Sequence, residues 1–205
     1  VEIKKENINY LKKCFGENVN IYAGDFLSSS SSFAFNFDYV IGNPPFTQRN
    51  TNSSNTLWNK FTTKSLLLWL KPSGFLIFVH PPGWRKPLGL RGVYRGLYDL
   101  MTKQNQMLYL EMHDSKDGLR VFKSGTRYDW YVIENKNPYK ETVVKNSKGK
   151  IETIETIKFN WLPNYNLKLI TDKLLAGPKD KKCPIIYSSS AYDCRKEWMS
   201  RTQDS

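Results

Sequence analysis

The sequence predicts an α/β fold built on a doubly wound, mostly parallel sheet. Short apolar runs bounded by turn residues, such as residues 38–41 and 75–80, have the length and composition of buried strands. Stretches with apolar residues three or four positions apart, such as residues 4–15, have the period of amphipathic helices. Because the two kinds of segment alternate along the chain, helices are expected to connect strands of a parallel sheet.

The predicted elements are, in chain order, helix 4–15, strand 19–23, strand 38–41, helix 57–70, strand 75–80, helix 91–104, strands 107–112 and 128–134, strand 151–159 and helix 166–176. The first helix is expected to end at Gly16, and the prolines of residues 81–83 stop the strand before them. Polar residues fill 28–32 and 47–56, where we predict loops. No helix is predicted between the strands 107–112 and 128–134, so an antiparallel pair is expected at that end of the sheet.

The chain of 205 residues has the length of one domain, or of one domain with an appended piece. Residues 136–150 are polar and rich in lysine, and residues 179–205 are basic with interspersed aromatic residues. We therefore predict a main domain over residues 1–135 and a basic C-terminal extension over residues 136–205. The chain opens at Val1 within an apolar–polar pattern, so a segment of a longer protein is expected.

Positive charge dominates the composition, with 31 Lys and Arg against 19 Asp and Glu and a formal net charge of +12. This balance predicts a polyanionic partner, with nucleic acid as the first choice and an anionic membrane surface as the second. The sequence contains no apolar run of 18 residues and no signal peptide, so no membrane segment is predicted. Cys14, Cys183 and Cys194 are odd in number and lack metal-ligand spacing, which favours a reduced, intracellular setting without a metal site.

One stretch, FDYVIGNPPF at residues 37–46, combines a strand with a turn that cannot continue a sheet. Pro44 and Pro45 remove two backbone donors, and the proline after Asn43 forces that residue out of the helical region. The turn therefore presents an amide, a carbonyl and the ring of Phe46 beyond the end of a strand. Ligands of open α/β sheets bind at that end of the strands.

This stretch resembles motif IV of the amino-methyltransferases that use S-adenosylmethionine, which is written Asn/Asp-Pro-Pro-Tyr/Phe after a hydrophobic strand. The resemblance implies a Rossmann-like sheet of the methyltransferase type, with Asn43, Pro44, Pro45 and Phe46 as catalytic residues in a partial catalytic domain. An exocyclic amine is a poor nucleophile because its lone pair is delocalised into the ring. The Asn43 side-chain oxygen and the Pro44 carbonyl would accept its N–H groups and localise that pair. An ordinary Asn-Pro turn at a strand end is the alternative.

The same resemblance implies a cofactor site for S-adenosylmethionine beside Asn43. Glu2 is in the position of the acidic residue that holds the cofactor ribose, since a carboxylate accepts two hydroxyl donors. Asp25 is in the position of the residue that accepts from the adenine amino group, and Phe26 would lie against the adenine. The alternatives are a frayed terminus for Glu2 and a turn or helix-capping role for Asp25. The glycine-rich cofactor loop of the family is missing from this sequence.

The downstream order resembles the gamma class of N6-adenine DNA methyltransferases, over residues 1–134. It implies that Phe46 and Phe122 sandwich an adenine flipped out of the duplex. Arg85 and Lys86 belong to a basic patch that would contact phosphates. A core aromatic for Phe122 and a solvated helix face for the patch are the alternatives.

The predicted function is transfer of a methyl group from S-adenosylmethionine to adenine N6 in DNA, within a restriction–modification system. The basic extension over residues 136–205 would then begin a target-recognition region. Ribosomal RNA guanine methyltransferases and release-factor glutamine methyltransferases use the same turn and remain alternatives. A third alternative is a nucleic-acid-binding module without catalysis, which the missing glycine-rich loop favours.

Overall fold

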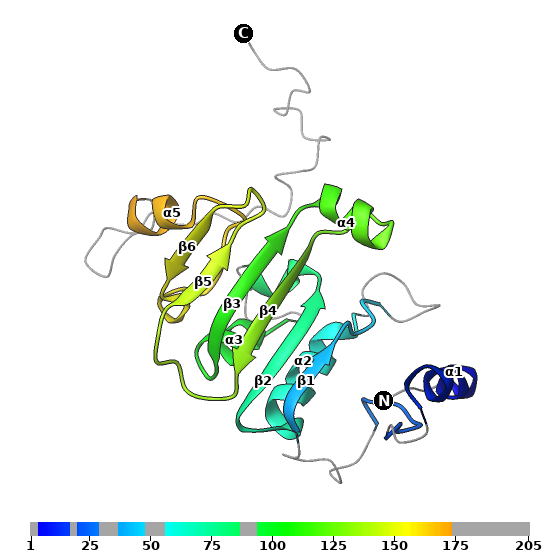
Figure 1. The fold of residues 1–205 in the computed structure, drawn as a ribbon. Helices are drawn as coiled ribbons and strands as arrows, with labels where there is room; N and C mark the ends of the chain where they lie inside the picture. The colour runs from blue at the N-terminus through cyan, green and yellow to red at the C-terminus, as the bar shows by residue number, and fades with distance from the viewer. Residues whose placement is uncertain (1–3, 17–19, 29–36, 48–55, 87–93, 174–205) are drawn as a thin grey trace, which may run out of the picture.

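A six-stranded sheet forms the centre of the computed structural model, which describes residues 4–16, 20–28, 37–47, 56–86 and 94–173. The strands lie in the order β1-β2-β4-β3-β5-β6, and helices α2 and α3 lie behind them in the view of Figure 1. The strands are β1 (Phe37–Gly42), β2 (Leu70–His80), β3 (Gln106–His113), β4 (Tyr128–Glu134), β5 (Thr142–Lys145) and β6 (Ile151–Ile154). The helices are α1 (Lys5–Phe15), α2 (Trp58–Lys64), α3 (Leu97–Thr102), α4 (Ser115–Phe122) and α5 (Leu167–Lys173), with shorter or irregular turns η2 (Ser65–Trp69), η3 (Pro82–Arg85) and η4 (Thr156–Lys158).

The sheet with its packed helices confirms the predicted α/β class. The sheet is mixed, so the prediction of mostly parallel strands is confirmed only in part. Strand β1 pairs with β2 in parallel and β3 pairs with β5 in parallel, whereas the other three pairings are antiparallel. The antiparallel pairing expected from the strands now called β3 and β4 is confirmed, but the pair lies in the middle of the sheet and not at an end, where it was predicted. The prediction that no helix separates these two strands was wrong, because α4 lies between them.

Side chains alternate between the two faces of the sheet, and one face carries the core. On that face Leu76 and Phe78 of β2 and Tyr131 of β4 are buried under α2, η2 and α3. The other face carries side chains such as Tyr39 and Ile41 of β1, which are 61% and 71% exposed. The described helices therefore cover one face of the central strands.

Most helix and strand predictions for the first half are confirmed, with shifted ends. Helix α1 ends at Gly16, whose positive φ of 85° suits a residue without a side chain. The helix predicted over 57–70 is α2 followed by the π-helical turn η2. The strand predicted over 19–23 was wrong in its described part, where only Ala23 makes a β-bridge. The helix predicted over 91–104 begins, among the residues described, at Leu97.

The sheet continues past residue 136, where the sequence analysis placed a boundary. Strand β5 pairs with β3, and β6 pairs with β5, so both belong to the same sheet as β1. Ile154, Leu162 and Leu167 join the same hydrophobic core. Residues 142–167 are thus packed into the main body. None of the described helices has the length and apolar character needed to cross a membrane.

Candidate functional site

An open cavity of about 1420 Å³ lies at the carboxyl end of β1. Its lining includes Asn43, Pro44 and Pro45 from the turn after β1, and Asp25 and Phe26 from the preceding segment. Helix α2 and the turns around it supply the other wall. The structure thus brings the predicted catalytic turn and the predicted adenine-binding residues to one hollow, although 17 residues separate Asp25 from Asn43 in the sequence.

Contacts at both ends fix the turn after β1. A side chain at Gly42 would place its Cβ 3.3 Å from the ring of Phe78, so a residue without a side chain permits this close approach. Pro44 is buried and Asn43 is exposed. The Leu57 backbone N–H donates to the carbonyl of Phe46 at 3.3 Å, which ties the end of the turn to the start of α2. The polar amide of Asn43 therefore faces solvent from a backbone that is fixed at both ends.

The segment carrying Asp25 is a turn fastened to α2 and η2. The Leu27 backbone N–H donates to Asp25 Oδ1 at 2.9 Å, so the turn role considered for this residue is present. Lys64 Nζ donates to the Leu27 carbonyl at 2.9 Å. Phe26 stacks on Phe61, with ring centroids 4.6 Å apart and an angle of 12°. These contacts use one carboxylate oxygen and leave Asp25 Oδ2 as an acceptor for a ligand of the cavity.

Phe46 and Phe122 touch each other, although 75 residues separate them in the sequence. Their ring centroids lie 6.0 Å apart at an angle of 70°, so the rings meet edge to face. Phe122 also packs edge to face on Tyr128 at 4.9 Å, and Tyr128 stacks on His113 at 4.3 Å and 5°. The two rings that the family resemblance places on either side of a base thus meet directly, and the sandwich stays a prediction. A base between them requires the rings to separate, because the observed contact is closed.

Arg85 does not belong to a basic surface, and that prediction was wrong. The side chain is 4% exposed, and its Nε lies 2.7 Å from Asp129 Oδ2. Its other nitrogens donate to Asp129 Oδ1 and to the carbonyl of Leu162. The guanidinium is therefore fully used inside the protein. Lys86 is exposed and Glu2 lies outside the described residues.

A buried polar network behind the turn was missed by the sequence analysis. His80 Nδ1 lies 2.9 Å from the Pro81 carbonyl and its Nε2 lies 2.8 Å from the Tyr131 hydroxyl. Since a carbonyl only accepts, Nδ1 carries the proton and Nε2 accepts from Tyr131. Burial lowers the pKa of His80 to about 3, and its ring stacks on Trp58 at 4.0 Å. A neutral histidine thus links the end of β2 to β4 and α2.

Another missed residue had a signal in the sequence. Asp129 follows Tyr128 and precedes the apolar run of β4, and an acidic residue in a buried strand needs a partner. Burial raises the pKa of the Asp129 carboxyl, while donors from Arg85 and Trp84 oppose this rise. The network of His80 has no comparable signal, because an isolated histidine in an apolar strand fits many environments.

No protein-family model and no curated protein matches the sequence. Among solved structures, the chain resembles the M protein of the EcoKI type I restriction enzyme, with a TM-score of 0.51 and 17% identity over 70% of this chain and 34% of that chain. It also resembles a chain of a type I restriction–modification system, with a TM-score of 0.48 and 17% identity over 62% of this chain and 27% of that one. A modification subunit from Vibrio vulnificus gives a TM-score of 0.40 and 12% identity, over 53% and 25% of the two chains. At such identities the likeness to the EcoKI M protein shows a shared fold, and the chain spans about a third of that protein.

Proposed function

We propose that the chain is part of a DNA methyltransferase that transfers a methyl group from S-adenosylmethionine to adenine N6. The observation that carries this proposal is the cavity shared by Asn43 and Asp25. An exposed amide next to a fixed carbonyl suits an amine substrate, and a carboxylate oxygen suits the adenine amino group of the cofactor. The fold shared with the EcoKI M protein supports the same assignment.

The residues of the turn would act on the amine as acceptors. Asn43 Oδ1 and the Pro44 carbonyl would take the two N–H groups of the adenine amino group, so that its lone pair points into the cavity. Charge that develops on nitrogen during transfer is then stabilised by acceptors that are already in place. The cofactor, when bound, supplies an electrophilic methyl group on a sulfonium. Asn43 Oδ1 and the Pro44 carbonyl would orient the amine toward this methyl group, and the proton that the nitrogen gives up would pass to bulk water.

The volume of the cavity supports a cofactor site beside the turn. Single ligand sites have volumes of roughly 300–1,000 Å³, and the open cavity here is about 1420 Å³. Asp25 and Phe26 would hold the adenosine end, and Glu2 would hold the ribose. Phe46 and Phe122, which are not among the residues that line this cavity, would receive the flipped adenine between their rings. Lys86 would contact a phosphate.

Two other functions use the same turn or the same charge. A ribosomal RNA or protein-glutamine methyltransferase would place another planar amine or amide against Asn43. A non-catalytic module would bind nucleic acid through its basic surface alone. The pair of aromatic rings beside the turn favours an unstacked base over a glutamine side chain, because both rings stack on bases.

The experiment follows labelled methyl groups from S-adenosylmethionine into duplex DNA, ribosomal RNA and release factor, with the chain placed in its full-length protein. Labelled N6-methyladenine in DNA, absent from the other two substrates, is the expected result. Label in RNA or protein alone would assign one of the alternatives. Cofactor binding without any transfer would reject the enzyme and leave the binding module. If transfer to DNA is found, we further infer a modification subunit of a type I restriction–modification system.

A further inference from the structure

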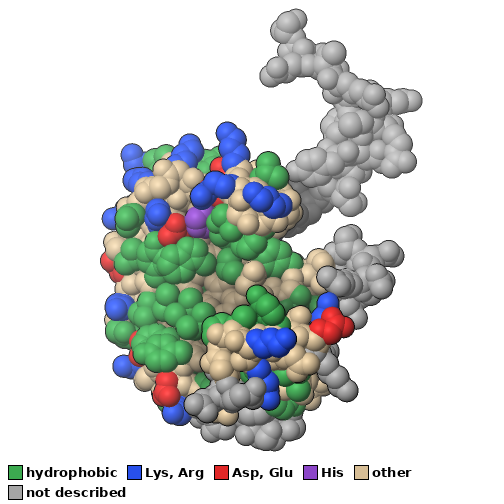
Figure 2. Space-filling model, turned by 45° about the vertical axis from the view of Figure 1, so that its right-hand side comes forward, with side chains coloured by type: hydrophobic (Ala, Val, Ile, Leu, Met, Phe, Trp, Pro, Cys, Tyr) green, Lys and Arg blue, Asp and Glu red, His purple; other side chains and the backbone are tan. Residues whose placement is uncertain are grey.

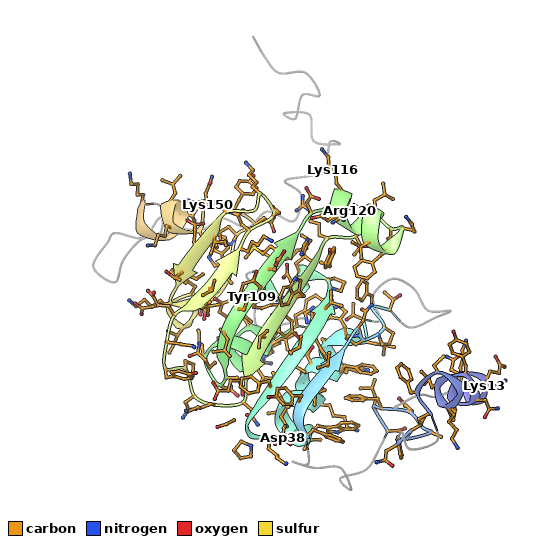
Figure 3. All side chains as sticks on the ribbon, viewed as in Figure 1. Lys13, Asp38, Tyr109, Lys116, Arg120 and Lys150 are labelled. Atoms are coloured by element: carbon orange, nitrogen blue, oxygen red, sulfur yellow. The ribbon has the colours of Figure 1, made fainter. Side chains whose placement is uncertain are left out.

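Helix α4 carries a basic stripe at the same end of the sheet as the candidate site. Lys116 and Arg120 are one turn apart on the helix, and Lys123 is the residue that ends it. Lys123 Nζ donates to the Arg120 carbonyl at 3.4 Å, which keeps its charge beside the other two. Figure 3 shows Lys116 and Arg120 at the end of the sheet opposite Asp38. In Figure 2, Lys and Arg side chains gather along the upper rim, above a band of hydrophobic side chains.

Few carboxylates oppose this stripe. Residues 115–127 contain the cations Lys116, Arg120, Lys123 and Arg127 and a single acidic residue, Asp117. Asp117 is shared between Arg120, at 3.1 Å, and His113, at 2.9 Å. Asp114, just before the helix, accepts from the backbone N–H groups of residues 116 and 117 and so serves as the helix cap. The stripe therefore presents a net positive charge to solvent.

The position of α4 is fixed relative to the candidate catalytic turn. Its last residue, Phe122, contacts Phe46, and its first half is tied to β3 through the hydrogen bond of Asp117 and His113. At Gly118 a side chain would bring its Cβ to 2.0 Å from the Thr126 carbonyl oxygen, so the helix lies directly on the following loop. These contacts fix the position of the stripe relative to Phe46, where a flipped base would bind.

We propose that α4 docks on the phosphate backbone of duplex DNA beside the extrahelical nucleotide, with Lys116, Arg120 and Lys123 as the contacting side chains. This inference rests on the proposed function, since the DNA is its substrate. The stripe spans about 10 Å of helix. One strand of a duplex carries one phosphate per about 3.4 Å of axis, so about three phosphates face that length. A solvated helix face has the same charges and makes no such contacts, and only a binding measurement separates the two.

The test measures binding of a fluorescent 20-base-pair duplex across a range of salt concentrations. The variant K116Q/R120Q/K123Q removes three charges from the stripe. The matched control K13Q/K136Q/K140Q removes three exposed charges elsewhere, on α1 and beyond β4. Each phosphate contact contributes about −0.9 to the slope of log K against log salt. We expect the stripe variant to lose about 2–3 units of slope, and at least about tenfold in affinity at moderate salt, while the control retains both.

Two further arms make the result specific. The variant K116R/R120K/K123R keeps the charges and should keep the wild-type slope, and melting curves of all variants should coincide. Equal slopes for the stripe variant and the control would overturn the proposal. The proposal would also be overturned if the stripe variant lost as much affinity for a polyglutamate peptide as it loses for duplex DNA. Binding of S-adenosylmethionine, measured in parallel, tests the proposed function separately: it should be equal in the wild type and the stripe variant, and its absence from both would reject the enzyme while leaving the docking result interpretable.

Discussion

The guanidinium of Arg85 and the carboxylate of Asp129 form a buried two-point ion pair. Nε lies 2.7 Å from Oδ2, and Nη2 lies 3.1 Å from Oδ1. Arg85 Nη1 also donates to the carbonyls of Leu162 and Pro163, at 3.3 Å each. One side chain thus joins η3, the start of β4 and the segment before α5.

Removal of this arginine should destabilise the protein strongly. In Arg85→Ala the carboxylate of Asp129 is left buried without its partner, and losses of about 3–5 kcal/mol are typical of such changes. The matched control is Lys71→Ala, which breaks the exposed pair of Lys71 and Asp38 at 3.0 Å and should cost about 1 kcal/mol or less. Urea unfolding of both variants measures the difference. Similar losses in the two would show that Arg85 has no special structural role.

Asn43→Ala should slow catalysis strongly and spare the fold. Loss of one placed acceptor costs about 10²–10³ in kcat in comparable sites, whereas the side chain of Asn43 is exposed and its removal should change the unfolding free energy by about 0.5 kcal/mol or less. Methyl transfer at saturating substrates and urea unfolding check the two parts. Thr47→Ala, at an exposed position just after the turn, is the control. Unchanged kcat in Asn43→Ala would remove this residue from the mechanism.

Asp25→Asn separates the turn role of this residue from its proposed cofactor role. Asparagine keeps an oxygen for the Leu27 N–H, so thermal stability should hold. It replaces the other acceptor with an NH₂ group, which cannot accept from the cofactor adenine. We expect the Kd for S-adenosylmethionine to rise about tenfold or more, as the loss of a hydrogen bond of about 1.5 kcal/mol implies. Isothermal titration measures this Kd, and an unchanged value would reduce Asp25 to a turn residue.

Gly118→Ala should destabilise α4, because its Cβ would lie 2.0 Å from the Thr126 carbonyl oxygen. The helix must shift to accept the methyl group, at a cost of about 1–3 kcal/mol or more. Gly125→Ala makes the same change where nothing lies within 4 Å, so it should be nearly neutral. Thermal melts of the two variants give the comparison. If Gly118→Ala has the same melting temperature as the wild type, α4 does not pack as closely on the loop at Thr126 as described.

His80 should make stability depend on pH. Burial lowers the pKa of His80 to about 3, from 6.5 in the unfolded chain. Between these values the unfolded state binds a proton that the folded state excludes, so stability is complete above pH 6.5 and falls as the pH drops, by up to about 1.4 kcal/mol per pH unit. The fall from pH 7.5 to 5.0 should be about 2 kcal/mol larger in the wild type than in His80→Gln. Equal falls, measured by urea unfolding, would contradict a neutral buried imidazole.

The sequence was most informative where the signal was local. The turn at Asn43 was readable because two prolines leave few conformations, and α1 and β4 were readable from spacing and apolar composition. Contacts over long separations were not readable: Arg85 looked like a surface cation because its partner, Asp129, is 44 residues away. Helix α4 was missed because Gly118 interrupts a short charged segment, although Asp114 with an acidic residue three positions later is a helix-start pattern. Of the antiparallel pairings only that of β3 with β4 was foreseen, and it lies in the middle of the sheet and not at an end, because the order and direction of strands depend on which strands become neighbours.

The two ends of the segment between Phe46 and Leu57 are paired with each other. Phe46 and Leu57 share a backbone hydrogen bond, and Thr47 pairs with Thr56 in an antiparallel bridge. Because these two contacts join the ends of the segment, the position of the turn at Asn43 does not depend on the number of residues between them. Doubling that length adds only about 0.6 kcal/mol in chain entropy. The position of the Asn43 amide therefore depends on these two contacts and not on the number of residues that they enclose.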